Sequence, residues 1–273
     1  MHMNTESLVE CLEGLEPAFV QASQRALRMQ KGVQSFNKLQ TGNPAIDIVT
    51  EADLATQELI LKAMRSTALT GCRLLAEEDT ESVQAFAAES NLYLGLDPID
   101  GTAVYARGAQ HFSTIVSLHN GEDFLYMFIH FPAWDWTLKV ARGKYVAVGT
   151  APKLPVLNDA ERSIIYWSGK PESNMPAELL SALDINGLRL RRMSSVAKGV
   201  ETIELFATNK IAGVYYENMN VYDGCAEYAI ASGRGQPVYS NVGSGKLRLS
   251  DIRSSQKGLY YPGYYLVLTR PMK

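Results

Sequence analysis

Short apolar segments that run directly into carboxylates constrain this chain of 273 residues more than any other feature. The apolar segment 92–96 reads as a buried strand and leads straight into DPIDGT at residues 97–102. A second apolar segment, 74–76, leads into Glu77. Acids at strand ends collect at one edge of a sheet, the usual ligand-binding position in α/β folds. We therefore expect these carboxylates to lie together.

Four acids are candidates for one cluster: Glu77, Asp97, Asp100, and Asp223 at the start of a late helix. Two unit charges about 4 Å apart repel by roughly 4 kcal/mol at an effective dielectric constant of about 20. Such a cluster therefore needs protons or cations. Hard divalent cations with all-oxygen ligands fit best, and magnesium completes its shell with water and substrate phosphate.

The hexapeptide offers a role for most of its residues. Asp97 would bridge two metals, the Ile99 carbonyl would point into the site, and Asp100 would reach the second metal. Gly101 allows a tight backbone, and its N–H with that of Thr102 would begin a helix aimed at a phosphate. The Thr102 hydroxyl would stand beside an attacking water. An Asp-Pro turn followed by Asp-Gly, two common loop pairs, explains the same residues at this point.

Apolar spacing in the first half of the chain predicts two long helices and then a run of strands. The first helix covers residues 5 to about 30, with Pro17 as a candidate break. Thr50, followed three places later by an acid, predicts the start of a helix that runs to about Met64. Strands are predicted at 74–76, 92–96, 112–118, 123–131, 135–140 and 144–148.

Strands and helices alternate in the second half. The predicted strands are 163–167, 189–193, 212–216, 237–239 and 264–269, and the predicted helices are 176–184, 197–208 and 223–232, the last ending at Gly233. This order indicates an α/β chain with two sheets and helices packed between them. We expect one catalytic unit over 1–273, with an N-terminal α+β half of about 1–150 and a C-terminal α/β half of about 151–273.

Composition excludes several classes of protein. The net charge of −3 and the pI near 5.9 give no basic stripe for nucleic acid, although a local site can still bind a small phosphorylated compound. The sequence contains no run of about 18 apolar residues, which a membrane-spanning helix would require. The three cysteines form no CxxC pair, which argues against zinc or a disulfide framework and fits a reducing, cytoplasmic location.

Four segments resemble, in order, motifs of the inositol monophosphatase family. This family comprises magnesium-dependent, lithium-sensitive phosphatases related to fructose-1,6-bisphosphatase. Residues 47–53 (DIVTEAD) resemble the early D-x-V-T-x-x-D, and 76–78 (AEE) resemble G-E-E with alanine for glycine. Residues 97–102 match D-P-I-D-G-T at every position, and 222–226 (YDGCA) resemble W-D-x-A-A less well. The pattern spans roughly residues 45 to 240.

The resemblance implies a layered αβαβα sandwich with two β-sheets, usually a homodimer, that holds two or three Mg²⁺ ions per subunit. Glu77 and Asp97 with the Ile99 carbonyl would hold the first magnesium. Asp97, Asp100 and Asp223 would hold the second, and Glu77 would also contact a third, weaker ion.

The resemblance further implies that Thr102, Asp53 and Glu77 are catalytic. Thr102, oriented by Asp53, would help deprotonate the water that attacks phosphorus, and the amides of Gly101 and Thr102 would bind the phosphate. The metals would lower the pKa of that water and neutralise charge on the phosphate.

Some positions depart from the family pattern. The family's Asn-Phe or Glu-Phe continuation after the hexapeptide is replaced by residues 103–105 (AVY). Glu217 looks like the family glutamate that binds substrate hydroxyls, although its spacing to Asp223 is one residue short, and a solvated loop acid is the other interpretation. Lys198 would contact a nucleotide or phosphate, or is a surface lysine.

The leading hypothesis is a magnesium-dependent phosphomonoesterase that hydrolyses a small polyol or sugar phosphate with a metal-activated water. A 3′(2′),5′-bisphosphate nucleotidase and a histidinol-phosphate phosphatase are alternatives within the same chemistry. A protein-interaction factor of the same fold, and a decayed enzyme that only binds ligands, remain open as alternatives of other classes.

Overall fold

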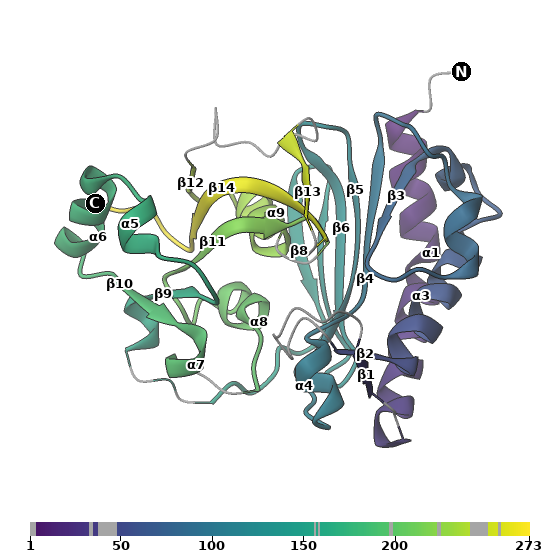
Figure 1. The fold of residues 1–273 in the computed structure, drawn as a ribbon, viewed down its shortest axis with the longest axis horizontal. Helices are drawn as coiled ribbons and strands as arrows, with labels where there is room; N and C mark the ends of the chain where they lie inside the picture. Colours follow the sequence, from purple (N-terminus) through teal and green to yellow (C-terminus); the bar gives the residue numbers. More distant parts are fainter. Residues whose placement is uncertain are drawn as a thin grey trace. The chain divides into compact units, whose positions relative to one another are not determined.

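The computed structural model describes residues 4–32, 35–37, 48–155, 157, 159–196, 199–222, 225–240, 251–255 and 258–273. The chain divides into two compact units, residues 1–150 and 151–273 (Figure 1). Among the described helices, none combines the length and the apolar character that a membrane crossing requires.

The first unit is built on a sheet with the strand order β3-β4-β5-β6-β7-β8. β3 and β4 are parallel, and every later neighbouring pair is antiparallel. The strands are β3 (Arg73–Ala76), β4 (Tyr93–Asp100), β5 (Ser113–His119), β6 (Phe124–Phe131), β7 (Trp136–Ala141) and β8 (Lys144–Val148). Short 3-10 turns η1 (Gln30–Gly32), η2 (Ala68–Gly71) and η3 (Glu81–Ala85) connect elements, and β1 (Ser35–Asn37) pairs with β2 (Ile48–Thr50).

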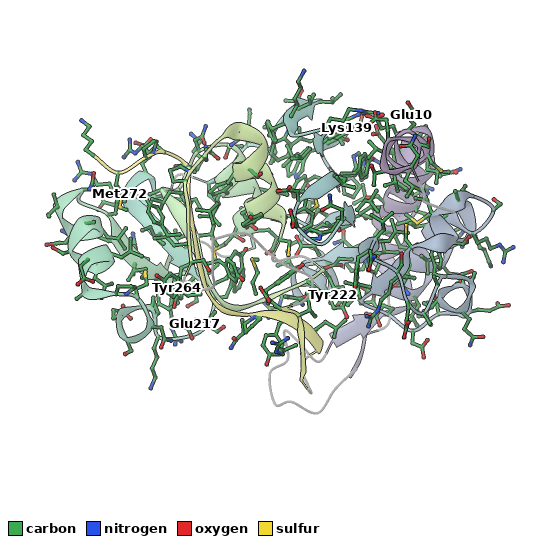
Figure 2. The ribbon with its side chains drawn as sticks, turned by 90° about the horizontal axis from the view of Figure 1, so that it is seen from above. Glu10, Lys139, Glu217, Tyr222, Tyr264 and Met272 are labelled. Atoms are coloured by element: carbon green, nitrogen blue, oxygen red, sulfur yellow. The ribbon has the colours of Figure 1, made fainter. Side chains whose placement is uncertain are left out.

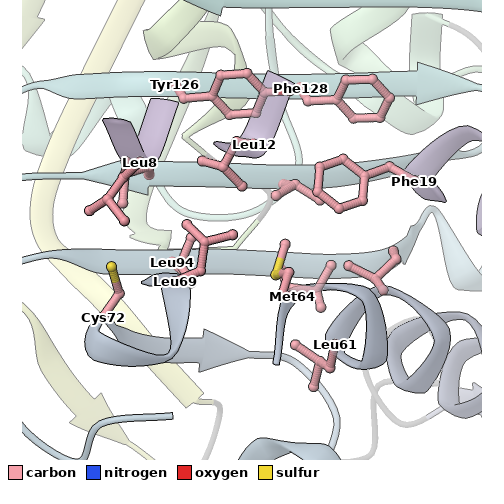
Figure 3. Close-up of a cluster of buried hydrophobic side chains, with 14 of the residues drawn as sticks. Leu8, Leu12, Phe19, Leu61, Met64, Leu69, Cys72, Leu94, Tyr126 and Phe128 are labelled. Atoms are coloured by element: carbon pink, nitrogen blue, oxygen red, sulfur yellow. The ribbon is translucent and has the colours of Figure 1, made fainter. Parts of the chain in front are cut away.

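Two helices, α1 (Thr5–Met29) and α3 (Glu51–Met64), pack against one face of this sheet (Figure 1). Their apolar stripes bury side chains against β4, β5 and β6, and Figure 3 shows this core with Leu12, Phe19, Leu61, Leu94 and Phe128 among its members. The predicted break at Pro17 is wrong, because α1 continues through it as one helix of 25 residues. Burial of the stripe on both sides of Pro17 offsets the backbone hydrogen bond that proline lacks.

The second unit contains a sheet with the order β10-β9-β11-β14-β12, and β13 also pairs with β14. Its elements are η4 (Ala160–Arg162), β9 (Ser163–Tyr166), α5 (Pro171–Asn174), α6 (Ala177–Ile185), β10 (Arg189–Arg192), α7 (Met193–Val196), α8 (Thr202–Ala207), β11 (Gly213–Asn220), α9 (Ala226–Arg234), β12 (Val238–Ser240), β13 (Arg253–Ser255) and β14 (Gly258–Leu268). The prediction that Gly233 ends the last helix is wrong, because Gly235 takes the left-handed conformation there, with φ 66°.

Candidate active site

The hexapeptide is the bulged end of a strand. β4 extends through Asp100, four residues beyond the predicted end at 96. Asp97 pairs with Ile115 and Asp100 pairs with Ser113, so three steps along β4 match two steps along β5. The extra residue is a β-bulge, one of the few places where a sheet accepts a proline such as Pro98.

The bulge decides where the two carboxylates point. Residues directly opposite each other on paired strands share a face, and Ile115 and Ser113 are two residues apart, so Asp97 and Asp100 share a face. Leu94 and Leu96 belong to the helix-covered core, which places the odd-numbered Asp97 on the opposite face. Both carboxylates are nearly buried, with 3% of Asp97 and 8% of Asp100 exposed.

Local hydrogen bonds hold the bulge in shape. Asp97 Oδ1 accepts the backbone N–H of Ile99 at 3.0 Å. The Thr114 hydroxyl donates to the carbonyl of Pro98 at 2.8 Å. The Ser113 hydroxyl donates to Asp100 Oδ2 at 3.1 Å. Sequence reasoning missed Ser113, because a serine at the start of an apolar strand carries no signal until the pairing of β4 with β5 is known.

Glu77 lies at the end of the neighbouring parallel strand. Ala76 pairs with Leu96, and the backbone N–H of Glu77 donates to the carbonyl of Leu96 at 3.1 Å. Extending this register by one residue puts the backbone of Glu77 next to that of Asp97.

Gln57, a second residue that sequence reasoning missed, fixes the backbone after Glu77. Its side-chain amide exchanges two hydrogen bonds with the backbone of Glu78, at 2.5 Å from Nε2 to the carbonyl and 3.0 Å from the Glu78 N–H to Oε1. The signal was available, because Gln57 lies four residues after Asp53 and so shares its helix face. Both side chains are fully buried.

Asp53 reaches the site from the first turn of α3. The helix begins with the predicted cap at Thr50, whose backbone N–H and hydroxyl both donate to Asp53 Oδ2, at 2.8 Å and 2.5 Å. The other oxygen, Oδ1, lies 3.4 Å from the hydroxyl of Thr102. The capping box therefore also fixes the carboxylate that faces Thr102.

The backbone turns sharply at Gly101, which has φ 88° and precedes the short helix α4 (Thr102–Ala106). An L-residue is strained in this left-handed region, so the glycine is required. Directly after it, the Thr102 hydroxyl lies 3.0 Å from the carbonyl of Ile99 as well as near Asp53. The single hydroxyl proton of Thr102 therefore has two acceptors within reach, Asp53 Oδ1 and the Ile99 carbonyl.

Several predicted positions lie outside the described residues: Asp47, Lys198 and Asp223. Within the part of the chain that the structure describes, no three His, Cys, Asp or Glu side chains form a group that could hold a metal ion. The metal site and the role of each site residue therefore stay predictions.

Glu217 lies on β11 of the second unit, paired with Tyr264 of β14 (Figure 2). Its Oε1 accepts the backbone N–H of Lys170 at 2.8 Å and the hydroxyl of Tyr215 at 2.9 Å. Gly169 has φ 95°, and a Cβ there would contact this carboxylate, so a larger residue would be strained and would displace the Glu217 side chain. Burial first, and then the bond to Glu217, raise the pKa of Tyr215.

Residues 7–254 match the model of the inositol monophosphatase family, which is most of the chain. The chain belongs to the inositol monophosphatase family. The predicted α/β fold class with two β-sheets is confirmed by this match and by the two six-stranded sheets of the structure. A search of curated protein sequences finds no match.

Solved structures of inositol monophosphatase (IMPase) proteins share the fold at low identity. The IMPase of Thermotoga maritima is 19% identical, with a TM-score of 0.58 over 92% of this chain and 90% of its own. Inositol monophosphatase II of Staphylococcus aureus is 17% identical, with a TM-score of 0.60 over 96% and 90%. An IMPase/NADP phosphatase crystallised with Mg²⁺ and phosphate is 17% identical, with a TM-score of 0.62 over 96% and 92%.

Proposed function

We propose that this chain is a magnesium-dependent phosphomonoesterase that acts on a small polyol or sugar phosphate. The observation that carries the proposal is the bulge in β4, because it turns Asp97 and Asp100 to one face. The register of β3 adds Glu77 next to them. Carboxylate oxygens at the ends of neighbouring strands are the type of ligand that a divalent cation such as magnesium prefers.

The donor set of these residues fits magnesium. It consists only of carboxylate and carbonyl oxygens, which hard cations prefer. Glu77, Asp97 and the Ile99 carbonyl would hold a first ion. Asp97, Asp100 and Asp223 would hold a second, with two or three ions in all. Bound magnesium supplies neutralisation of phosphate charge and a lower pKa for water.

Thr102, oriented by Asp53, would help to deprotonate the attacking water. When the Thr102 hydroxyl donates its hydrogen bond to Asp53 Oδ1, the lone pairs of the hydroxyl oxygen are free to accept a hydrogen bond from water. The amides of Gly101 and Thr102 would donate to the phosphate. Both groups follow the bulge directly, so the backbone itself fixes the phosphate relative to the carboxylates.

Glu217 and Lys198 would bind the rest of the substrate. Among the described residues, the Lys170 N–H and the Tyr215 hydroxyl both donate to Oε1 of Glu217, so Oε2 is the oxygen that would accept a substrate hydroxyl. We further propose a homodimer, inhibition by lithium and a cytoplasmic location. Structural neighbours bound with D-inositol-1-phosphate and with NADP and Ca²⁺ support a small phosphorylated substrate.

Release of inorganic phosphate tests the proposal. The panel contains D-inositol-1-phosphate, NADP, 3′-phosphoadenosine 5′-phosphate and histidinol phosphate, each with and without magnesium and lithium. We expect turnover to require magnesium and to fall by orders of magnitude in Asp97→Asn. Asp184→Asn, at an exposed position of α6, is the control and should match the wild type. Unchanged turnover in Asp97→Asn would refute the proposal.

A further inference from the structure

The end of α1 and the short helix α4 are tied together by a reciprocal set of hydrogen bonds. The Tyr105 hydroxyl donates to the Ala26 carbonyl at 2.7 Å. That carbonyl also accepts the backbone N–H of Gln30. In return, Gln30 Nε2 donates to the carbonyls of Tyr105 at 3.1 Å and Ala109 at 2.6 Å. Figure 1 shows α4 and the end of α1 at the same end of the first unit.

These bonds matter because α4 has only five residues. An isolated helix of that length does not form in water, since one turn costs more conformational entropy than its hydrogen bonds return. Its position must come from tertiary contacts. Tyr105 supplies one of these contacts: its ring is fully buried and packs edge-on against Phe112, with centroids 4.8 Å apart and an angle of 82°.

The same small core reaches both partners of the Thr102–Asp53 contact. Tyr105 and Phe112 cluster with Ala52, which precedes Asp53, and with Ile99, whose carbonyl lies 3.0 Å from the Thr102 hydroxyl. Burial raises the pKa of the Tyr105 hydroxyl, and the carboxylate of Asp53 raises it further. Tyr105 therefore stays a neutral hydrogen-bond donor throughout the working pH range.

We propose that Tyr105 is a positioning residue for the reaction: through its bond to α1 it sets the place of Thr102 against Asp53. Tyr105 does not touch the substrate. This inference rests on the proposed function, in which Thr102, oriented by Asp53, helps to deprotonate the attacking water. It also assigns a task to the AVY continuation that departs from the family pattern.

Tyr105→Phe removes only the hydroxyl and keeps the buried ring. One buried hydrogen bond is worth about a factor of ten in the balance between an aligned and a displaced α4. We therefore expect kcat to fall severalfold, with about tenfold as the upper limit. KM and the magnesium affinity measured by calorimetry should stay within twofold, because the carboxylates of β4 do not depend on this bond.

Tyr126→Phe is the matched control. Tyr126 is also a fully buried tyrosine whose hydroxyl donates to α1, at 3.0 Å to Glu16, but it lies on β6 in the main core. The Tyr126→Phe variant should lose about as much free energy of unfolding as Tyr105→Phe and keep the wild-type kcat. Equal losses of kcat in the two variants would show that Tyr105 acts through general stability, and would overturn the proposal.

A double-mutant cycle with Thr102→Ala separates positioning from other effects. In that background Tyr105→Phe should change kcat by less than about twofold, because the group that it positions is gone. If Tyr105→Phe lowers kcat by the same factor with and without Thr102→Ala, the two effects are independent, and the proposal is overturned.

Hydrogen exchange gives a readout that needs no activity. The amides of Val104 and Tyr105 donate to the Gly101 carbonyl at 2.8 Å and 2.9 Å. Their exchange should be faster in Tyr105→Phe, by up to about tenfold, and should not change in Tyr126→Phe. Unchanged exchange in Tyr105→Phe contradicts the link. If the wild type hydrolyses no phosphate ester, the proposed function fails, and exchange alone decides whether Tyr105 holds α4.

Discussion

Asp53→Asn separates the two tasks of one buried carboxylate. Oδ2 accepts both hydrogen bonds from Thr50, and Oδ1 faces the hydroxyl of Thr102 at 3.4 Å. Asparagine has one oxygen and one NH₂ group. Because the Thr50 N–H needs an acceptor, the oxygen must take the place of Oδ2, and the NH₂ group then faces Thr102.

The stability cost of this change is small. The helix cap is retained through the remaining oxygen, and the loss is limited to a weaker capping bond and the interaction of a charge with the helix dipole, about 1–2 kcal/mol together. Typical domains are stable by about 5–15 kcal/mol, so the variant should fold.

The cost to turnover is larger. An NH₂ group donates to the hydroxyl oxygen of Thr102, occupies a lone pair and directs the hydroxyl proton elsewhere. Thr102 can then no longer accept a hydrogen bond from water in the proposed way. We expect kcat to fall by about a hundredfold or more, the usual range for losing a general acid–base function, with little change in KM.

The assay is magnesium-dependent phosphate release, together with urea unfolding of each variant. Thr50→Ser is the control, because its hydroxyl and N–H can make the same bonds to Asp53; its kcat should stay within twofold of the wild type. A folded Asp53→Asn protein with wild-type kcat would refute the assignment of Asp53. A protein that has lost its urea transition would instead show that the cap carries more of the fold than calculated.

Two further predictions follow from backbone strain and from buried histidines. Gly101→Ala should lower the free energy of unfolding by about 1–2 kcal/mol, because φ is 88° there. Gly14→Ala should raise it by about 0.5–1 kcal/mol, because Gly14 lies inside α1 and a Cβ there would meet no other atom. Urea unfolding of both variants checks these opposite signs. Burial lowers the pKa of His119 and of His130 to about 4, against about 6.5 when unfolded. The unfolded chain thus binds more protons between these values, so stability is fully present above pH 6.5. It falls by about 1.4 kcal/mol per pH unit for each histidine down to about pH 4. A His130→Gln protein with the same slope as the wild type between pH 7 and pH 5 would contradict this.

Features that depend on neighbouring residues were predictable from the sequence. The capping box at Thr50 and the helix that follows it need only residues three or four apart, and the structure has both where the pattern predicts them. The strand candidates of the first half also agree closely with β5 to β8, because apolar runs between turn residues encode them locally. The family motifs rest on the same kind of short-range signal.

Features that depend on tertiary pairing were not predictable. Gly233 and Gly235 are both candidate helix stops in the sequence, and α9 continues to Arg234 so that Gly235 forms the cap. Pro17 breaks an isolated helix, yet the core around α1 holds it straight enough to continue. Ser113 carries no signal in the sequence until the pairing of β4 with β5 shows that its hydroxyl contacts the carboxylate of Asp100.

The bulge explains why two aspartates three residues apart can serve one site. In a regular strand, side chains alternate with a period of two, so positions 97 and 100 would point to opposite faces. One extra residue in β4 makes them equivalent to neighbours two apart on β5, and proline favours that irregularity since it cannot donate to the ladder. The left-handed Gly101 then ends the strand and starts α4 within one residue. The hexapeptide thus specifies the backbone geometry as well as the acids, which is why its spacing is meaningful only at a bulged strand end.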